Sequence, residues 1–233
     1  MKAVILAGGK GTRLKPYTTV IPKALVPIGE QAILEILLKQ LKRYNVTDVT
    51  ICLNHFAEII QAYFGNGEKL GITISYSIED QPLGTVAPIK LIDHLPQDFL
   101  VMNGDLLTDL NFTELFLHHQ QHKSLLTVSS YQRKSRIDFG VLEVDPESQI
   151  VSGFREKPEL DFIVSMGVYA MNRKVLDFVP DGPFGFDELI LTLLSHNQRL
   201  KVFPFAGYWL DIGRPDDYEK ANEDMKTNPN LFS

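Results

Sequence analysis

The sequence predicts an α/β fold in which a mostly parallel mixed sheet is flanked by helices, with an antiparallel-rich second half. Short apolar runs alternate with amphipathic segments up to about residue 123, which is the pattern of parallel strands joined by helices. The first of these runs ends at a glycine-rich loop, and the chain after residue 124 contains several strand-like runs with few helices between them. These three observations carry the prediction.

The first half consists of alternating strand and helix patterns. Residues 2–7 are apolar and β-prone and stop abruptly at two glycines, as a buried strand does at a tight loop. Apolar residues then recur at spacings of three and four, which predicts an amphipathic helix over 30–44. The further expected elements are strands at 49–53, 72–76 and 99–102 and helices at 57–64 and 112–122.

The second half is expected to add mixed or antiparallel strands to the same sheet. The expected strands are 125–128, 139–144, 150–154 and 162–171, and closing helices are expected at 186–194 and 215–226. Pro215 stands near the start of the last helix, where its fixed φ is favourable. No linker or low-complexity tract separates the halves, so a single domain over 1–233 is expected, with halves 1–123 and 124–233.

Composition and charge exclude several classes of protein. The chain has 233 residues, is 44% hydrophobic and carries a formal net charge of −6, which is typical of a globular domain and excludes intrinsic disorder. Nucleic-acid binding requires a basic face, and no Lys/Arg run provides one, so no nucleic-acid partner is expected. The single cysteine, Cys52, excludes an internal disulfide framework. No apolar run approaches about 18 residues, so we expect no membrane partner and a soluble, cytoplasmic protein.

The loop at residues 6–14 is the first candidate ligand site, because open α/β sheets bind ligands beyond the carboxyl ends of their strands. Its three glycines allow main-chain N–H groups to approach phosphate oxygens, and Lys10 and Arg13 add positive charge. This composition suits a triphosphate, and a simple glycine-rich turn is the alternative. A dinucleotide fingerprint is disfavoured because Leu14 stands where its third glycine belongs, and a Walker loop is disfavoured because the lysine precedes the last glycine.

The loop and the segments after it resemble the sugar-1-phosphate nucleotidylyltransferases, the enzymes that make nucleotide-diphosphate sugars. Residues 6–18 (LAGGKGTRLKPYT) and 22–28 (PKALVPI) are together similar to the opening of that family. The resemblance continues in the family's order at 82–85 (PLGT), 103–105 (NGD), 140–141 (GV), 156–158 (EKP), 166–169 (MGVY) and 209–213 (WLDIG). The pattern is closest to the mannose-1-phosphate guanylyltransferase branch.

The resemblance implies a Rossmann-like core with the nucleotide in the half 1–123 and the sugar phosphate in the half 124–233. The implied reaction is attack of a sugar 1-phosphate on the α-phosphorus of a nucleoside triphosphate, which releases pyrophosphate. A phosphate monoester has a second pKa of about 6, so the nucleophile needs no strong base at neutral pH. The chain departs from the family at Val86-Ala87, where many members have Ala-Gly.

The resemblance also implies that Arg13, Lys23, Asp105 and Asp211 are the catalytic residues and that Mg²⁺ is the cofactor. Asp105 and Asp211 would hold the metal between the α-phosphate and the sugar phosphate, since carboxylate oxygens are hard ligands. Lys23 is expected near the α-phosphate and Arg13 near the leaving pyrophosphate. Taken singly, each aspartate would be interpreted as a helix-cap or turn residue and each cation as a solvated surface charge. Their position within the family's motifs favours the functional interpretation instead.

Two sets of binding residues complete the expectation. The nucleotide-binding set is Leu6, Ala7, Gly8, Gly9, Gly11, Thr12, Arg13, Lys23, Glu79, Gln81, Gly84, Thr85 and Asp105. The sugar-phosphate-binding set is Gly140, Glu156, Lys157, Gly167 and Trp209, with a core role as the alternative for Trp209. Gly84 is expected to lie against the base or ribose, because the missing Cβ permits close approach.

The expected substrates are a nucleoside triphosphate and a sugar 1-phosphate, most of all GTP and mannose 1-phosphate or a manno-configured sugar. Base selection is expected at 79–85, where the sequence leaves open whether Glu79 or Gln81 faces the base. A carboxylate would suit guanine N1–H and N2–H₂, whereas an amide would suit thymine or uracil. The alternatives are thymidylyl, uridylyl or cytidylyl transfer to glucose 1-phosphate or another sugar 1-phosphate, and a catalytically silent sugar-nucleotide-binding regulatory subunit. The sequence leaves homo-oligomerisation open.

Overall fold

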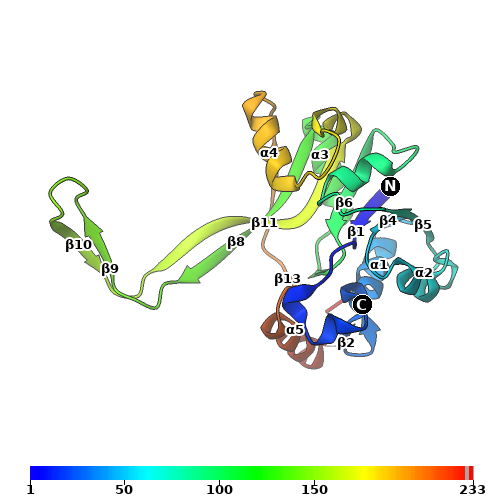
Figure 1. Cartoon of the computed structure of the whole chain (residues 1–233), viewed down its shortest axis with the longest axis horizontal. Coiled ribbons are helices and arrows are strands. Elements are labelled where there is room, and N and C mark those ends of the chain that lie inside the picture. Colours follow the sequence, from blue (N-terminus) through cyan, green and yellow to red (C-terminus); the bar gives the residue numbers. More distant parts are fainter. Residues whose placement is uncertain (229–230, 233) are drawn as a thin grey trace.

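A computed structural model describes residues 1–228 and 231–232 and confirms the α/β fold class (Figure 1). Its centre is a seven-stranded sheet with the strand order β12-β8-β11-β6-β1-β4-β5. These strands are β1 (Lys2–Leu6), β4 (Asp48–Leu53), β5 (Thr73–Ile78), β6 (Asp98–Asn103), β8 (Leu126–Arg136), β11 (Glu159–Asn172) and β12 (Lys201–Phe205). Residues 229, 230 and 233, at the end of the expected single domain, lie outside the described residues.

The strands of the first half are parallel, as the alternating pattern predicts. β1 pairs with β4 on one side and with β6 on the other, and β4 pairs with β5. Leu6, the last residue of β1, is in register with Cys52 and Asn103. The carboxyl ends of these strands therefore meet at one edge of the sheet, where ligands of such sheets bind.

Helices cover both faces of the sheet. The long helices are α1 (Ile33–Arg43), α2 (Ala57–Phe64), α3 (Phe112–His122), α4 (Phe186–Ser195) and α5 (Pro215–Thr227). α1, α2 and α3 pack with Ala3 and Ile5 on one face, whereas α4 packs with Val4 on the other, because consecutive strand residues point to opposite faces. Among the described residues, no helix is both long enough and apolar enough to cross a membrane.

A third apolar cluster holds the glycine-rich loop in place. Leu14 ends a single 3-10 turn after the loop and is fully buried against residues of α1, α5 and the short strand β7 (Leu106–Thr108). The ring of Tyr17 lies 4.8 Å from that of Tyr218 in α5, measured between ring centroids. The last helix of the chain thus packs against the segment that follows the first strand.

The predicted start of the first helix at residue 30 is wrong. α1 begins at Ile33, because the preceding residues form a small hairpin in which β2 (Pro27–Ile28) pairs with β3 (Gln31–Ala32). The N–H group of Gly29, at the tip of the hairpin, donates a hydrogen bond to the Asn222 side chain in α5. α2 and α3 span the residues expected of them.

The second half adds mixed pairings to the sheet and also builds an arm that leaves it. β11 is antiparallel to β6 and to β8, and β12 is parallel to β8. β8 and β11 run on beyond the sheet and carry β9 (Val141–Val144) and β10 (Val151–Arg155) at their far end (Figure 1). The expectation that all these strands join one sheet is wrong for β9 and β10, because a tight turn at Asp145 pairs them locally as a two-stranded sheet.

Hydrogen bonds tie the loop after β5 to the segment before α4. The Phe184 N–H donates to the Leu83 carbonyl, and the Phe184 carbonyl accepts from Val86 N–H at 3.0 Å. Gly84 lies inside this contact with φ of +86°, and a Cβ added to it would stand 2.7 Å from the Phe184 carbonyl oxygen. The glycine is therefore required by the protein's own backbone packing, whereas its contact with a base stays a prediction.

We expect Gly84→Ala to lower the unfolding temperature more than Gly182→Ala does. Gly182 also has a positive φ (+98°), but its missing Cβ faces open space. Both substitutions place a Cβ on a left-handed backbone, which lowers the free energy of unfolding by about 1–2 kcal/mol. Only in Gly84→Ala does the new Cβ also overlap the Phe184 backbone, and such overpacking typically costs a further amount of about 1–3 kcal/mol. Calorimetry of the two variants measures the difference, and equal shifts would contradict the packing role of Gly84.

Candidate active site

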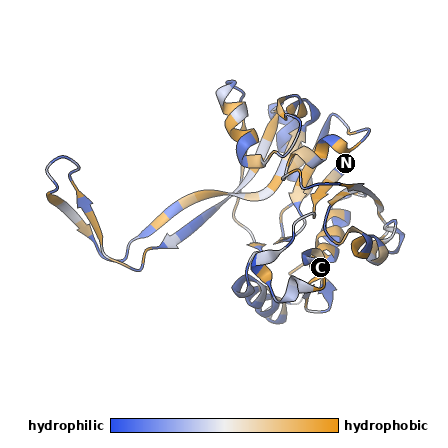
Figure 2. Cartoon of the chain, viewed as in Figure 1, coloured by the Kyte–Doolittle hydropathy of each residue, from blue (hydrophilic) through white to orange (hydrophobic). Residues whose placement is uncertain are grey.

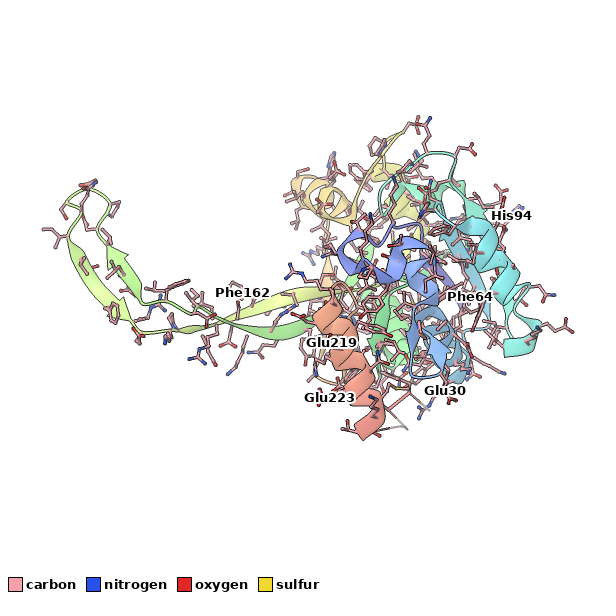
Figure 3. All side chains as sticks on the ribbon, turned by 60° about the horizontal axis from the view of Figure 1, so that its bottom comes forward. Glu30, Phe64, His94, Phe162, Glu219 and Glu223 are labelled. Atoms are coloured by element: carbon pink, nitrogen blue, oxygen red, sulfur yellow. The ribbon has the colours of Figure 1, made fainter. Side chains whose placement is uncertain are left out.

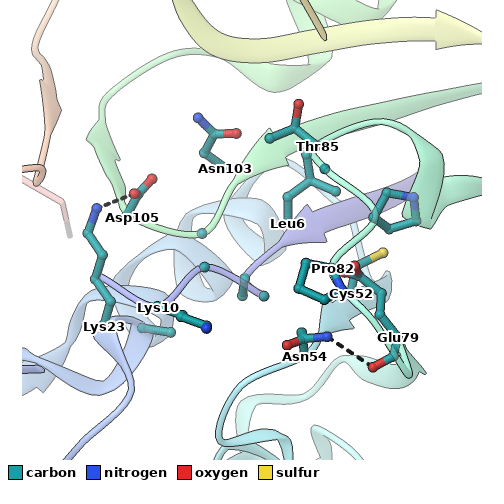
Figure 4. A pocket seen from close by; sticks show the side chains of 17 residues that line it. Leu6, Lys10, Lys23, Cys52, Asn54, Glu79, Pro82, Thr85, Asn103 and Asp105 are labelled. Carbon is teal, nitrogen blue, oxygen red and sulfur yellow. Dashed lines mark hydrogen bonds and ion pairs between the residues drawn. The ribbon is translucent and has the colours of Figure 1, made fainter. Parts of the chain in front are cut away.

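A cavity of about 430 Å³ opens at the edge where β1, β4 and β6 end (Figure 4). It is lined by Leu6, Ala7, Gly8, Gly9, Lys10, Lys23, Ala24, Cys52, Asn54, Glu79, Pro82, Gly84, Thr85, Pro88, Asn103, Gly104 and Asp105. Nine of the thirteen residues expected to bind nucleotide line the cavity. The four that do not are Gly11, Thr12, Arg13 and Gln81. Among the described residues, the lining comes from the first half of the chain alone.

The glycine-rich loop forms one wall of this cavity. The strand hydrogen bonds continue past Leu6, because Ala7 N–H donates to the Cys52 carbonyl and Gly104 N–H donates to the Leu6 carbonyl. Gly11 lies outside the lining, and a Cβ on it would stand 3.1 Å from the Cβ of Lys23. The loop thus turns tightly enough for a lysine from the next segment to reach the same cavity.

Lys23 and Asp105 form an ion pair at one end of the cavity (Figure 4). Asp105 lies in the turn between β6 and β7, and Lys23 begins a single 3-10 turn that buries Ala24. The lysine binds the Oδ2 atom of Asp105, whereas the Oδ1 atom is buried and has no hydrogen-bond partner among the described residues. A buried carboxylate oxygen without a partner is costly, so this atom is suited to a ligand.

Asp211 lies beside Asp105 although the two residues come from different halves of the chain. β13 (Trp209–Asp211) pairs antiparallel with β7, which places Asp211 opposite Leu106, and Ile212 N–H donates to the Asp105 carbonyl at 3.1 Å. Burial raises the pKa of Asp211, the Asp105 carboxylate raises it further, and Lys23 and Arg13 oppose the increase. The sequence-predicted pair of carboxylates is therefore brought together.

The two carboxylates are suited to hold Mg²⁺. Among the described residues, no group of three or more His, Cys, Asp or Glu side chains could hold a metal ion by itself. Magnesium in nucleotide sites uses one or two carboxylates and completes its coordination with water and substrate phosphates. The unpartnered Oδ1 of Asp105 and the neighbouring carboxylate of Asp211 fit that requirement.

Arg13 is not part of the cavity lining but lies close to the turn after Asp211. Its guanidinium carbon is 3.7 Å from the position of a Cβ on Gly213, the second residue after Asp211. The Asp217 carboxylate accepts hydrogen bonds from the N–H groups of Gly213 and Arg214. The start of α5 therefore fixes this turn, and the exposed Arg13 adds a positive charge that acts on the Asp211 carboxylate.

Of the two candidates for contact with a base, Glu79 lines the cavity, whereas Gln81 is exposed outside it. The Oε2 atom of Glu79 accepts from Leu83 N–H at 2.9 Å, and Asn54 donates to the Glu79 carbonyl (Figure 4). Burial raises the pKa of Glu79, and the hydrogen bond from Leu83 partly offsets the increase. The carboxylate is thus oriented while its other oxygen stays available.

Sequence reasoning missed Asn54 as a cavity residue. Asn54 directly follows β4, and the rule that ligand sites collect residues after parallel strands would have found it. It also missed Cys52, which lies at the end of the same strand and whose thiol pKa burial raises to about 12. A thiol with so high a pKa stays protonated at neutral pH and has little nucleophilic reactivity.

The five residues expected to bind the sugar phosphate are divided between two places. Gly167 and Trp209 lie near the cavity: a Cβ on Gly167 would meet the Asn103 side chain, and the Trp209 indole N–H donates to the Met166 carbonyl at 3.0 Å. The other three, Gly140, Glu156 and Lys157, lie on the arm, outside the cavity.

Several known proteins are similar to this chain. It is 33% identical over 227 residues to a probable mannose-1-phosphate guanylyltransferase 3 of rice (Oryza sativa), covering 94% of this chain and 63% of the relative. It is 32% identical to a mannose-1-phosphate guanyltransferase of Candida albicans, of which 62% is covered. The chain thus spans less than two thirds of the length of these relatives.

Two solved structures share the fold. HddC from Yersinia pseudotuberculosis, solved in complex with GMP-PN, is 29% identical and superimposes with a TM-score of 0.74 over 96% of this chain and 99% of that one. A putative glucose-1-phosphate thymidylyltransferase from Bacillus anthracis has a TM-score of 0.78 at 23% identity, over 96% and 94% of the two chains. The family model described as nucleotidyl transferase matches residues 2–228, so the chain belongs to the nucleotidyl transferase family.

Proposed function

We propose that this chain transfers a nucleotidyl group from a nucleoside triphosphate to a sugar 1-phosphate, with Mg²⁺ as cofactor and pyrophosphate as the second product. The observation that carries the proposal is the cluster of Lys23, Asp105 and Asp211 at the end of a cavity walled by a glycine-rich loop. Cations and hard oxygen ligands beside a glycine-rich turn meet the needs of a reaction between two anions.

The roles of the residues follow from their positions. Asp105 and Asp211 would hold Mg²⁺, which neutralises phosphate charge when bound. The main-chain N–H groups around Gly8 and Gly9 bind phosphate oxygens. Lys23 orients Asp105 through their ion pair and adds positive charge at the reacting phosphate, and Arg13 adds positive charge near Asp211 for the leaving pyrophosphate.

We further propose that the preferred nucleotide is GTP, read by Glu79. An ionised carboxylate accepts hydrogen bonds and donates none. Guanine presents two adjacent donors, N1–H and N2–H₂, whereas the single N3–H of uracil or thymine stands between two carbonyl oxygens that would repel a carboxylate. The buried position of Glu79 in the cavity supports this assignment.

For the sugar, we propose mannose 1-phosphate or another manno-configured sugar 1-phosphate, which the similarity to the rice and Candida proteins supports. Thymidylyl, uridylyl or cytidylyl transfer to glucose 1-phosphate or another sugar is the alternative. A silent regulatory subunit is disfavoured, because Arg13, Lys23, Asp105 and Asp211 are all retained around the cavity. Pyrophosphate release with GTP, UTP, dTTP and CTP against several sugar 1-phosphates distinguishes these activities, and no release with any combination would contradict the enzymatic proposal.

We expect Asp105→Asn to lower turnover by well over tenfold, because it removes one of two anionic metal ligands. The matched control is Asp93→Asn, which makes the same change at an exposed aspartate outside the cavity and should leave turnover unchanged. Pyrophosphate release at saturating substrate measures both variants. A loss below about tenfold, or roughly 1.4 kcal/mol, would remove Asp105 from the proposed role.

We expect Asp211→Asn to abolish activity while making the metal-free protein more stable at neutral pH. The pKa of Asp211 is raised in the folded state, so its stabilising contribution is full only at low pH and is lost as the pH rises through the raised pKa. The charges facing it are Asp105 and Asp217, which raise its pKa, and Lys23 and Arg13, which lower it. Thermal unfolding in EDTA should show the advantage of the variant at pH 7.5 and its decline toward pH 5. An advantage that grows on acidification would contradict this account.

We expect Glu79→Gln to reduce the ratio of kcat/KM for GTP over UTP by about tenfold or more, because a mismatched buried hydrogen-bonding group costs about 1 to 3 kcal/mol. Gln81→Ala is the control and should leave the ratio unchanged. Since the raised pKa of Glu79 makes the carboxyl protonate above its ordinary range, the KM for GTP should rise on acidification in the wild type and less in the variant. Unchanged ratios in Glu79→Gln would place base recognition elsewhere.

A further inference from the structure

A second cavity, of about 440 Å³, lies at the edge of the sheet where β6 begins. Its lining includes Asp98, the first residue of β6, and Asn172, the last residue of β11, which pair with each other in the sheet. The candidate active site lies at the other end of the same strand, where Asn103 lines it. At about 3.3 Å per residue, the strand places Asp98 roughly 17 Å from Asn103.

The core of the protein lies between the two cavities. Residues 99–102 of β6 are fully buried and apolar, and Figure 2 shows this part of the sheet as hydrophobic. Leu125, which lines the second cavity, directly precedes β8, and β8 runs from there to the opposite edge and into the arm. The segment before β6 carries His94, which lies on the side of the body away from the arm (Figure 3). The second cavity is therefore separate from the candidate active site and from the arm.

A buried histidine lines this cavity and has one nitrogen without a partner. His119 lies on α3 and is only 1% exposed. Its Nδ1 atom is 2.9 Å from the Thr127 hydroxyl, whereas its Nε2 atom is buried and has no hydrogen-bond partner among the described residues. Leaving a buried polar atom unpaired is costly, so a ligand or a water molecule is expected to bind Nε2.

The Asp98 carboxylate lies across a gap from this nitrogen. Its Oδ1 atom is 3.6 Å from the His119 Nε2 atom, which is longer than a hydrogen bond. The same oxygen accepts a hydrogen bond from the Asn172 side chain at 2.7 Å, which fixes the position of the carboxylate. The two groups are thus held close to each other without bonding directly.

The protonation of His119 follows from its surroundings. Burial lowers the pKa of His119, although the Asp98 carboxylate opposes the decrease, so the imidazole is neutral at neutral pH and carries one N–H group. Because a carboxylate only accepts hydrogen bonds, we assign the proton to Nε2, which faces Asp98. The Nδ1 atom then accepts from the Thr127 hydroxyl.

An atom that fills the gap must accept one hydrogen bond and donate another. The donor on the protein is the His119 Nε2–H group, and the acceptor is the Asp98 carboxylate. A hydroxyl oxygen can do both. An ionised phosphate or carboxylate oxygen cannot donate, and it would also be repelled by Asp98. The gap therefore favours a hydroxyl group, from a ligand or from water.

Two exposed lysines give the lining a net positive charge. Lys123 follows α3 and Lys174 follows β11, and both line the cavity. With Asp98 as the acidic residue of the lining and His119 neutral, the balance is 2 − 1 = +1, in a chain whose formal net charge is −6. A local positive charge on an acidic protein attracts anions, and lysine ammonium groups bind phosphate.

We propose that this cavity is a second ligand site, which binds a hydroxylated phosphate monoester of the size of a sugar phosphate. One hydroxyl of the ligand bridges His119 and Asp98, and its phosphate binds Lys123 and Lys174. The volume is within the range of about 300–1,000 Å³ that is typical of small-molecule sites. The inference rests on this cavity alone and does not depend on the proposed transfer reaction.

Titration with glucose 6-phosphate, followed through the NMR signals of ¹³C-labelled histidine rings, tests the site. This probe carries hydroxyls and a phosphate but lacks the 1-phosphate on which the proposed reaction acts. The chain has six histidines, so the ring signals are few, and the His119→Asn variant identifies the one from His119. We expect that signal to shift saturably at millimolar probe. A His119 signal that does not move would mean that water alone fills the gap, and it would overturn the proposal.

Glucose and inorganic phosphate separate the two parts of the proposed ligand. Glucose 6-phosphate should bind at least about tenfold more tightly than either of them, because it alone reaches both the His119–Asp98 pair and the lysines. Inorganic phosphate that binds as tightly as the ester would contradict the role of the hydroxyl. Glucose that binds as tightly as the ester would contradict the role of the lysines.

Two variants test the same division within the protein. Asp98→Asn keeps an oxygen for Asn172 but removes the carboxylate, so it should weaken glucose 6-phosphate by about tenfold and leave inorganic phosphate unchanged. Lys174→Met should weaken both probes. An unchanged affinity for glucose 6-phosphate in either variant contradicts the proposal.

Lys69→Met is the matched control for Lys174→Met, because it removes an exposed lysine outside the cavity and should leave both affinities unchanged. Thermal melting shows whether the variants fold. Lys174 is exposed, so its variant decides the outcome even where Asp98→Asn does not fold. Pyrophosphate release without the probe should be the same in both lysine variants and the wild type, and a loss in Lys174→Met alone would contradict the separation of the two cavities.

Discussion

The antiparallel pairing of β7 with β13 is the constraint on which the candidate active site depends. It places Asp211 next to Asp105 and so joins the two halves of the chain at one point. Burial and the neighbouring Asp105 carboxylate both raise the pKa of Asp211, and Lys23 and Arg13 offset only part of that increase. An arrangement that is unfavourable without a ligand is typical of a functional site.

The sequence predicted the core of the fold because its patterns are local. α2 and α3 have the bounds that apolar spacing and glycine stops indicated. The start of α1 was not predictable, because spacing does not show that the residues before it pair in a hairpin. The same limit applies to β9 and β10: alternation identifies strands, but the choice of partner depends on the turn at Asp145 and on packing that the pattern does not contain.

The candidate site was predictable where motifs coincide with strand ends. The glycine-rich loop, Lys23 and Asp105 meet in one cavity, as expected from the parallel strands. The choice between Glu79 and Gln81 was not predictable, because both follow the end of β5, where the alternation of strand faces no longer applies. The hydrogen bond from Leu83 N–H holds the Glu79 carboxylate at the cavity, and the loop that provides this bond is in turn tied to Phe184.

Glu79 and the arm carry the residues expected at the base and at the sugar phosphate, and the two are anchored to the fold in different ways. Glu79 is buried in the first half, where hydrogen bonds from Leu83 and Asn54 fix its position relative to the glycine-rich loop. Glu156 and Lys157 lie on a ribbon joined to the body by two strands. A substitution near Glu79 affects the packing of the core, because Glu79 is buried there. A substitution at the tip of the arm affects only the ribbon. If Glu79 contacts the base and Glu156 and Lys157 contact the sugar phosphate, as the sequence leads us to expect, selection of the sugar is less tightly coupled to the stability of the fold than selection of the base.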